Sequence, residues 1–111
     1  MMRYQVAFEG RAGRRAGQFD ADLLQVGLEE VVNELLARRA QDATVSWTLA
    51  KGRIEISLTV EAPGFEEALH AGEALIAQAL QAAGFDAAWS VEWSSVRTSR
   101  VGRPKAELVQ A

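Results

Sequence analysis

The residues best suited to chemistry in this chain of 111 residues lie between positions 10 and 19. This Gly/Arg segment reads GRAGRRAGQF and combines three glycines with three arginines. Glycines let backbone N–H groups turn toward a ligand, and arginine binds carboxylates and phosphates through paired donors. Two further basic residues are predicted to reach the same end of the sheet. The candidate anion-binding residues are therefore Gly10, Arg11, Gly13, Arg14, Arg15, Gly17, Lys51 and Arg53.

Three interpretations fit the Gly/Arg segment: a solvated connection, a small-anion site or a protein-docking loop. A helix is expected to begin after Asp20, and a helix N-terminus favours an anion. However, Asp20 is itself a good N-cap, and Asp22 adds a second negative charge close by. The glycine spacing lacks the GK[ST] ending of a phosphate-binding loop and does not match the dinucleotide fingerprint. The segment therefore predicts a positively charged contact surface rather than an active site.

Together with the strand expected before it, the Gly/Arg segment resembles the start of an acylphosphatase. That family carries a Gly-rich loop with an essential arginine after its first strand, and an asparagine on its second strand that positions the attacking water. The resemblance implies that Arg14 or Arg15 binds a phosphate. The chain departs from the family because the Val-Gln-Gly core is absent and residues 44–48 contain no asparagine. An acylphosphatase-like hydrolase, or a phosphate- or carboxylate-binding domain, is therefore the alternative prediction.

Other chemistry has little support in the sequence. The chain has no cysteine, which excludes disulfides, thiolate metal sites and a cysteine nucleophile. His70 shares one helix stripe with Glu66 and Glu73, but one histidine and two carboxylates without a second cluster do not define a metal site. We therefore predict no catalytic residues, no metal and no cofactor.

The elements that position these residues follow from hydrophobic periodicity. Alternation of apolar and polar residues predicts strands over 3–9, 44–49, 54–60 and 87–93, and helical spacing predicts helices over 20–39 and 65–83. The order β-α-β-β-α-β is that of the ferredoxin-like α+β sandwich, with a four-stranded antiparallel sheet and two helices on one face. The crossover rule gives the strand order fourth, first, third, second.

The second and third strands are predicted to form a hairpin. A turn at Lys51-Gly52 pairs Leu49 with Ile54, Trp47 with Ile56 and Val45 with Leu58. Every inward residue then faces an inward residue. Trp47, Trp89 and Trp93 all fall on the inward side, which predicts core positions, with a ligand cavity between sheet and helices as the alternative.

Length and composition predict one domain over residues 1–97 and a basic, flexible tail over 98–111. No signal peptide or membrane-spanning run is present, so we expect a cytoplasmic protein without membrane contact. The net charge is −3, and the open sheet face is predicted to carry no aromatic residue, which argues against nucleic-acid binding there. These features favour a small non-enzymatic binding or assembly domain that self-associates as a homo-oligomer or docks to a protein partner.

Overall fold

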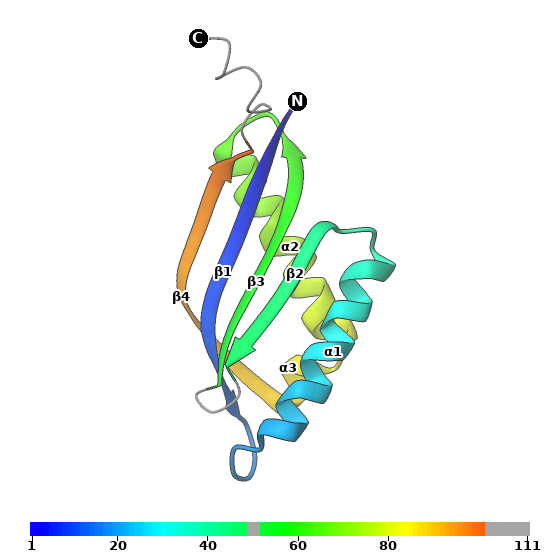
Figure 1. Cartoon of the computed structure of the whole chain (residues 1–111), viewed down its shortest axis with the longest axis vertical. Coiled ribbons are helices and arrows are strands. Elements are labelled where there is room, and N and C mark those ends of the chain that lie inside the picture. Colours follow the sequence, from blue (N-terminus) through cyan, green and yellow to red (C-terminus); the bar gives the residue numbers. More distant parts are fainter. Residues whose placement is uncertain (49–51, 102–111) are drawn as a thin grey trace.

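The computed structural model describes residues 1–48 and 52–101. Figure 1 shows a single antiparallel sheet with helices packed on one of its faces, which confirms the predicted ferredoxin-like fold. In chain order the elements are β1 (Met2–Arg14), α1 (Ala21–Ala37), β2 (Gln41–Thr48), β3 (Arg53–Ala62), α2 (Phe65–Ala82), α3 (Phe85–Ala88) and β4 (Trp89–Arg100).

The sheet has the strand order β2-β3-β1-β4, as predicted. β1 lies at the centre and pairs antiparallel with both β3 and β4. β2 and β4 are therefore the edge strands, and each has only one neighbour in the described part of the chain. The side chains that β1 turns inward, including Tyr4, Val6 and Phe8, are buried beneath the helices.

Helix α1 begins where the sequence predicts. The carboxylate of Asp20 accepts hydrogen bonds from the backbone N–H groups of Asp22 (3.0 Å) and Leu23 (3.2 Å). This is N-cap geometry, and it satisfies two donors that the first helical turn would otherwise leave open. The helix buries one stripe of side chains against the sheet: Leu24, Leu28, Val31 and Leu35.

Helix α2 lies close to the sheet because small residues line its buried face. A Cβ atom added at Gly72 would lie 3.1 Å from the Cβ of Val6, a spacing tighter than most real contacts. Ala68 and Ala79 are also fully buried on this side. No helix in the described part of the chain combines the length and the hydropathy needed to cross a membrane.

All four strands are longer than predicted, and β1 and β4 are extended most. β1 continues to Arg14, so the first half of the Gly/Arg segment belongs to the sheet and the connection to α1 is shorter than predicted. β4 follows a helical turn, α3, and continues to Arg100, three residues beyond the predicted end of the domain at position 97. The extension of β1 pairs with the start of β4, and the extension of β4 pairs with the first half of β1, so backbone pairing stabilises both, although their sequences do not alternate cleanly. Residues 102–111 of the predicted tail lie outside the described residues.

The register of the β2–β3 hairpin differs from the prediction. Trp47 pairs with Ile54 rather than Ile56, and Val45 pairs with Ile56 rather than Leu58. A shift of two residues keeps every side chain on its own face of the sheet, so the hydrophobic pattern alone does not distinguish the two registers. The predicted partner of Ile54, Leu49, lies outside the described residues.

A β-bulge interrupts the pairing of β1 with β4. The register shifts between Glu9 and Gly10, which leaves Ser94 as the extra residue of β4. The Ser94 hydroxyl donates a hydrogen bond to the Glu9 carbonyl oxygen (3.2 Å). A Cβ at Gly10 would lie 2.5 Å from the Glu92 carbonyl oxygen and 2.8 Å from the Trp93 ring, so only glycine fits here. Because of the bulge, the inward-facing residues of β4 continue from Trp93 to residue 96.

Candidate functional site

A cavity of about 480 Å³ lies between β4, the inner face of β1 and helix α2. We call it the β4–α2 cavity. Its volume falls within the range of about 300–1,000 Å³ that is typical of small-molecule sites. The apolar lining consists of Phe8, Ile76, Ala77, Leu80, Val91, Trp93 and Val96, and the charged lining residues are Arg15, Glu73 and Asp86.

The cavity forms because the helices of residues 1–48 and 52–101 leave the middle of the inner face of β4, from Val91 to Val96, partly uncovered. Val96 is 43% exposed although it faces inward, and Val91 and Trp93 are only half-buried. In Figure 1, α2 passes behind the central strands and α1 lies to the right of β2, whereas the upper part of β4 stands at the left edge of the sheet. The inner surface of this edge strand is therefore open to a ligand.

An aromatic pair forms one wall of the cavity. The rings of Phe8 and Trp93 meet edge to face, with centroids 5.7 Å apart and an interplanar angle of 67°. Trp89, by contrast, is 3% exposed and stacks on Phe85 with centroids 6.0 Å apart, deep in the core. Of these two tryptophans, Trp93 is the one placed to pack against a bound aromatic molecule, because aromatic rings favour such offset and edge contacts.

The part of β4 that lines the cavity runs from Val91 to Val96, and its length can be taken from the pairing with β1. Val96 pairs with Phe8, and Val91 pairs with Ala12, so the lining spans five residues of β1, which are four steps along the strand. At about 3.3 Å per residue this corresponds to roughly 13 Å. The length and the apolar walls suit an elongated molecule of two or three fused rings.

Opposite ends of the cavity carry different charges. Glu73 follows Gly72, which packs against Val6, and therefore lies toward the Phe8 end. Arg15 lies at the other end, where its backbone N–H donates to the Ala88 carbonyl oxygen (3.0 Å). An elongated ligand in the cavity would therefore meet the Glu73 carboxylate at one end and, at the other, the Arg15 guanidinium with Asp86 beside it.

The guanidinium of Arg15 is held by the short helix α3. Its Nε donates a hydrogen bond of 2.6 Å to the backbone carbonyl oxygen of Asp86. Within residues 1–48 and 52–101, no carboxylate forms an ion pair with Arg15. The neighbouring Arg14 does not line the cavity and donates instead to the Gln18 carbonyl oxygen (3.1 Å).

The structure divides the predicted anion-binding residues between two faces. Arg11 pairs directly with Arg53 on the outer face of the sheet, away from the helices. They line a shallow hollow of about 280 Å³ together with Gly10, Glu92 and Ser94. Gly13 lies in β1, Gly17 has a positive φ in the loop before α1, and Arg15 lines the β4–α2 cavity. Lys51 lies outside the described residues.

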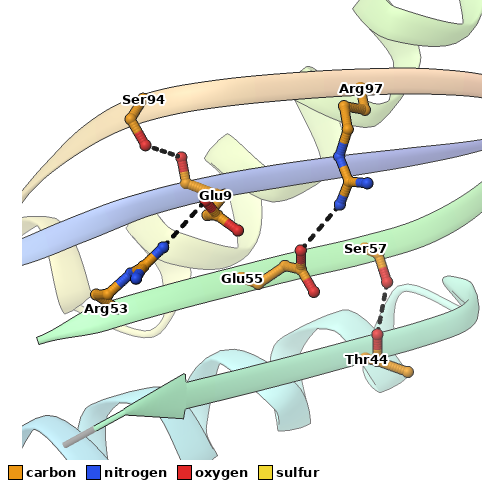
Figure 2. Close-up of polar contacts among 7 residues, drawn as sticks. All are labelled: Glu9, Thr44, Arg53, Glu55, Ser57, Ser94 and Arg97. Carbon is orange, nitrogen blue, oxygen red and sulfur yellow. Dashed lines mark hydrogen bonds and ion pairs between the residues drawn. The ribbon is translucent and has the colours of Figure 1, made fainter.

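The outer face of the sheet is a network of polar side chains (Figure 2). Arg53 pairs with Glu9 at 3.3 Å, and Arg97 of β4 reaches across β1 to pair with Glu55 of β3 at 3.1 Å. The hydroxyls of Thr44 and Ser57 share a hydrogen bond. This face therefore satisfies much of its own polarity, whereas the β4–α2 cavity presents apolar surface.

Sequence reasoning missed most of the cavity residues. Trp93 had been assigned to the core, with a ligand cavity as the alternative, and Glu73 was considered only as part of a metal stripe with His70. Asp86 carries no sequence signal for a site. Within residues 1–48 and 52–101, no group of three or more His, Asp or Glu side chains is placed to hold a metal ion.

Comparisons with known proteins bear on the fold. No protein-family model matches the chain, and no curated protein matches it significantly. Among solved structures the chain is similar to a protein from Chloroflexus aurantiacus J-10-fl that is provisionally named an antibiotic biosynthesis monooxygenase. The alignment covers 92% of this chain and 95% of the other, with a TM-score of 0.52 and 14% sequence identity. At this identity the likeness establishes the shared fold.

The functional prediction from the sequence requires correction. We predicted a non-enzymatic assembly or docking domain, with anion binding or acyl phosphate hydrolysis by the Gly/Arg segment as the alternative. The structural neighbour carries the name of an enzyme, and the alignment covers 95% of its chain. In this chain half of the Gly/Arg segment lies in a strand, and the structure places Arg11 on the outer face of the sheet and Arg15 at the cavity on the inner face.

Proposed function

We propose that this chain is an enzyme that acts on a small aromatic molecule bound in the β4–α2 cavity. The observation that carries the proposal is the cavity of about 480 Å³ itself, with an apolar lining and a few charged groups at its ends. This combination is typical of sites that bury an apolar ligand and orient it through a few polar contacts. The enzyme name of the structural neighbour supports oxygenation as the reaction class.

Monooxygenation places one atom of O₂ in the substrate and reduces the other to water. The two electrons that this requires come either from a cofactor or from the substrate. An electron-rich phenol can supply them itself: 1-naphthol and O₂ together have the atoms and electrons of 1,4-naphthoquinone and water. Two fused rings also suit the length of the cavity, which makes 1-naphthol a suitable first substrate to test.

The chain would contribute water exclusion and proton transfer to this reaction. Phe8, Trp93 and Ile76 line a surface from which bound aromatic rings would displace water. Glu73 and Asp86 are the carboxylates in the lining, so they are the groups that can accept the proton of a substrate hydroxyl. A phenolate is oxidised more readily than the corresponding phenol.

The experiment measures O₂ uptake with an oxygen electrode and quinone formation by absorbance, for phenols of one, two and three fused rings. Ala77 lines the cavity from an exposed position on α2, and the next residue, Gln78, is exposed but does not line it. We expect Ala77→Trp to abolish turnover and binding and Gln78→Trp to preserve both. Neither binding nor O₂ uptake with any phenol, or equal activity in the two variants, would contradict the proposal.

A further inference from the structure

We infer that Arg15 selects aromatic substrates that carry a carboxylate group. This inference rests on the proposed function, because it assigns a substrate class to the same cavity. The Arg15 side chain lines one end of the β4–α2 cavity, where apolar lining from Leu80 and Val91 gives way to charge. A carboxylate on an aromatic body would leave its rings beside Trp93 and bring its charged end to Arg15.

The hydrogen bond from Nε fixes which donors Arg15 can offer. Because Nε donates to the Asp86 carbonyl oxygen at 2.6 Å, the fork between Nε and the neighbouring Nη is already in use. The fork between Nη1 and Nη2 remains, and in the described part of the chain neither of these nitrogens donates to a protein acceptor. Two parallel N–H donors match the two oxygens of a carboxylate, and such bidentate pairs are among the stronger charge-assisted hydrogen bonds.

The backbone around Arg15 holds the side chain in place. Arg14 is the last residue of β1 and pairs with Trp89, and the N–H of Arg15 donates to the Ala88 carbonyl oxygen at 3.0 Å. The side chain and the main chain of Arg15 are therefore both hydrogen-bonded to α3. A donor held in this way loses less conformational freedom when it binds a ligand, which favours selective recognition.

The charge balance of the cavity defines the orientation of the ligand. Glu73 and Asp86 contribute two negative charges against the single positive charge of Arg15. The cavity as a whole does not attract anions, so a carboxylate is recognised only where it contacts the Nη atoms directly. At the opposite end, Glu73 repels a carboxylate and accepts a hydrogen bond from a hydroxyl group. The substrate class is therefore a hydroxylated aromatic carboxylate, with its carboxylate at Arg15.

Calorimetric titration with 2-naphthoate and with its neutral analogue 2-naphthamide tests this inference. We expect the unmodified protein to bind 2-naphthoate more tightly, and Arg15→Gln to weaken 2-naphthoate binding about tenfold while changing 2-naphthamide binding less than about twofold. Arg14→Gln is the matched control, since Arg14 lies next in sequence but does not line the cavity. We expect it to leave both affinities unchanged. Circular dichroism confirms that each variant is folded.

A second variant tests the charge argument separately. Asp86→Asn removes the negative charge beside Arg15 and keeps the backbone carbonyl that holds Nε. We expect this variant to bind 2-naphthoate more tightly, with the gain decreasing as ionic strength rises. Unchanged affinity for 2-naphthoate in both Arg15→Gln and Asp86→Asn would overturn the inference.

The outcomes separate this inference from the proposed function. If both naphthalene compounds bind, Ala77→Trp blocks them, and Arg15→Gln weakens them equally or not at all, then the cavity binds aromatic molecules but Arg15 does not select carboxylates. If neither compound binds to the unmodified protein, the proposed function fails and the inference fails with it.

Discussion

The two halves of the inner sheet face obey the same sequence pattern but are covered differently. Beneath the helices, Ile54, Ile56 and Leu58 of the central strand β3 are 1% exposed or less. Beside β4, inward-facing Val96 keeps 43% of its surface exposed, and a cavity of about 480 Å³ takes the place of packed side chains. The first half holds the fold together, and the second half leaves room for a ligand.

This difference shows that facing inward and being packed are separate properties. Side-chain alternation determines which face of the sheet a residue occupies. Whether that face is sealed depends on where the helices lie, and here they lie over the central strands and the β2 edge (Figure 1). A function that needs apolar surface can therefore use β4 without losing the core around α1.

The largest expected effect on stability distinguishes the two tryptophans of β4. Trp89 is 3% exposed and stacks on Phe85, so Trp89→Ala should lower the free energy of unfolding by about 3–5 kcal/mol. Urea denaturation followed by circular dichroism measures this loss. Trp93→Ala should be less destabilising and should instead abolish aromatic ligand binding. A loss below about 1 kcal/mol for Trp89→Ala would contradict its assignment to the core.

The bulge beside the cavity provides the next prediction. Gly10→Ala forces a Cβ against the Glu92 carbonyl oxygen and the Trp93 ring, so β4 must shift. We expect a loss of about 1–3 kcal/mol, as for other overpacking substitutions, together with weaker ligand binding. The matched control is Gly13→Ala, where the nearest atom, Oγ of Ser90, lies 3.6 Å from the added Cβ. Equal stability of the two variants in urea denaturation would contradict the packing described at the bulge.

Two valines provide a matched comparison of the packed and open halves. Val31 of α1 is fully buried, so Val31→Ala should cost about 1.5 kcal/mol of stability and leave ligand affinity unchanged. Val96 lines the cavity, so Val96→Ala should change stability by less than about 0.5 kcal/mol but weaken ligand binding. Thermal denaturation and calorimetric titration of both variants provide the test. The opposite pattern would show that the open half is part of the core.

The smallest effect is expected on the outer face. The Arg97–Glu55 ion pair is exposed, with 68% of the Arg97 side chain accessible to solvent. Such pairs contribute little, so Arg97→Gln should lower the free energy of unfolding by about 0.5 kcal/mol or less, and high salt should remove the difference. Ligand affinity should remain unchanged. A large loss of affinity would place the functional surface on the outer face instead.

The fold could be predicted from the sequence because its strands and helices each bury one face. Alternation in residues 3–9 and 54–60 and helical spacing from Asp20 onward determined the order of elements, and the crossover rule then determined the sheet order. The extension of β1 through Gly10 and Gly13 could not be predicted, since glycines in a strand resemble those of a loop. The two-residue shift of the hairpin also left no trace in the hydrophobic pattern.

The candidate site could be predicted only in part. Arg15 was identified as an anion-binding residue, but together with Arg11 and Arg53, which the structure places on the opposite face of the sheet. Trp93 was correctly placed on the inward side, yet periodicity does not report whether a helix covers that position. The cavity depends on the position of α2 relative to β4, which is a property of the whole fold.

The most direct test of the β4–α2 cavity as a ligand site is a ¹H–¹⁵N NMR titration with 2-naphthamide that follows the indole N–H signals of the tryptophans. We expect the Trp93 signal to shift and to saturate, because Trp93 lines the cavity. The signal of Trp47, which lies on β2 at the other edge of the sheet, should remain in place. A Trp93 signal that does not respond, or one that moves no more than that of Trp47, would contradict the assignment of the β4–α2 cavity as a ligand site.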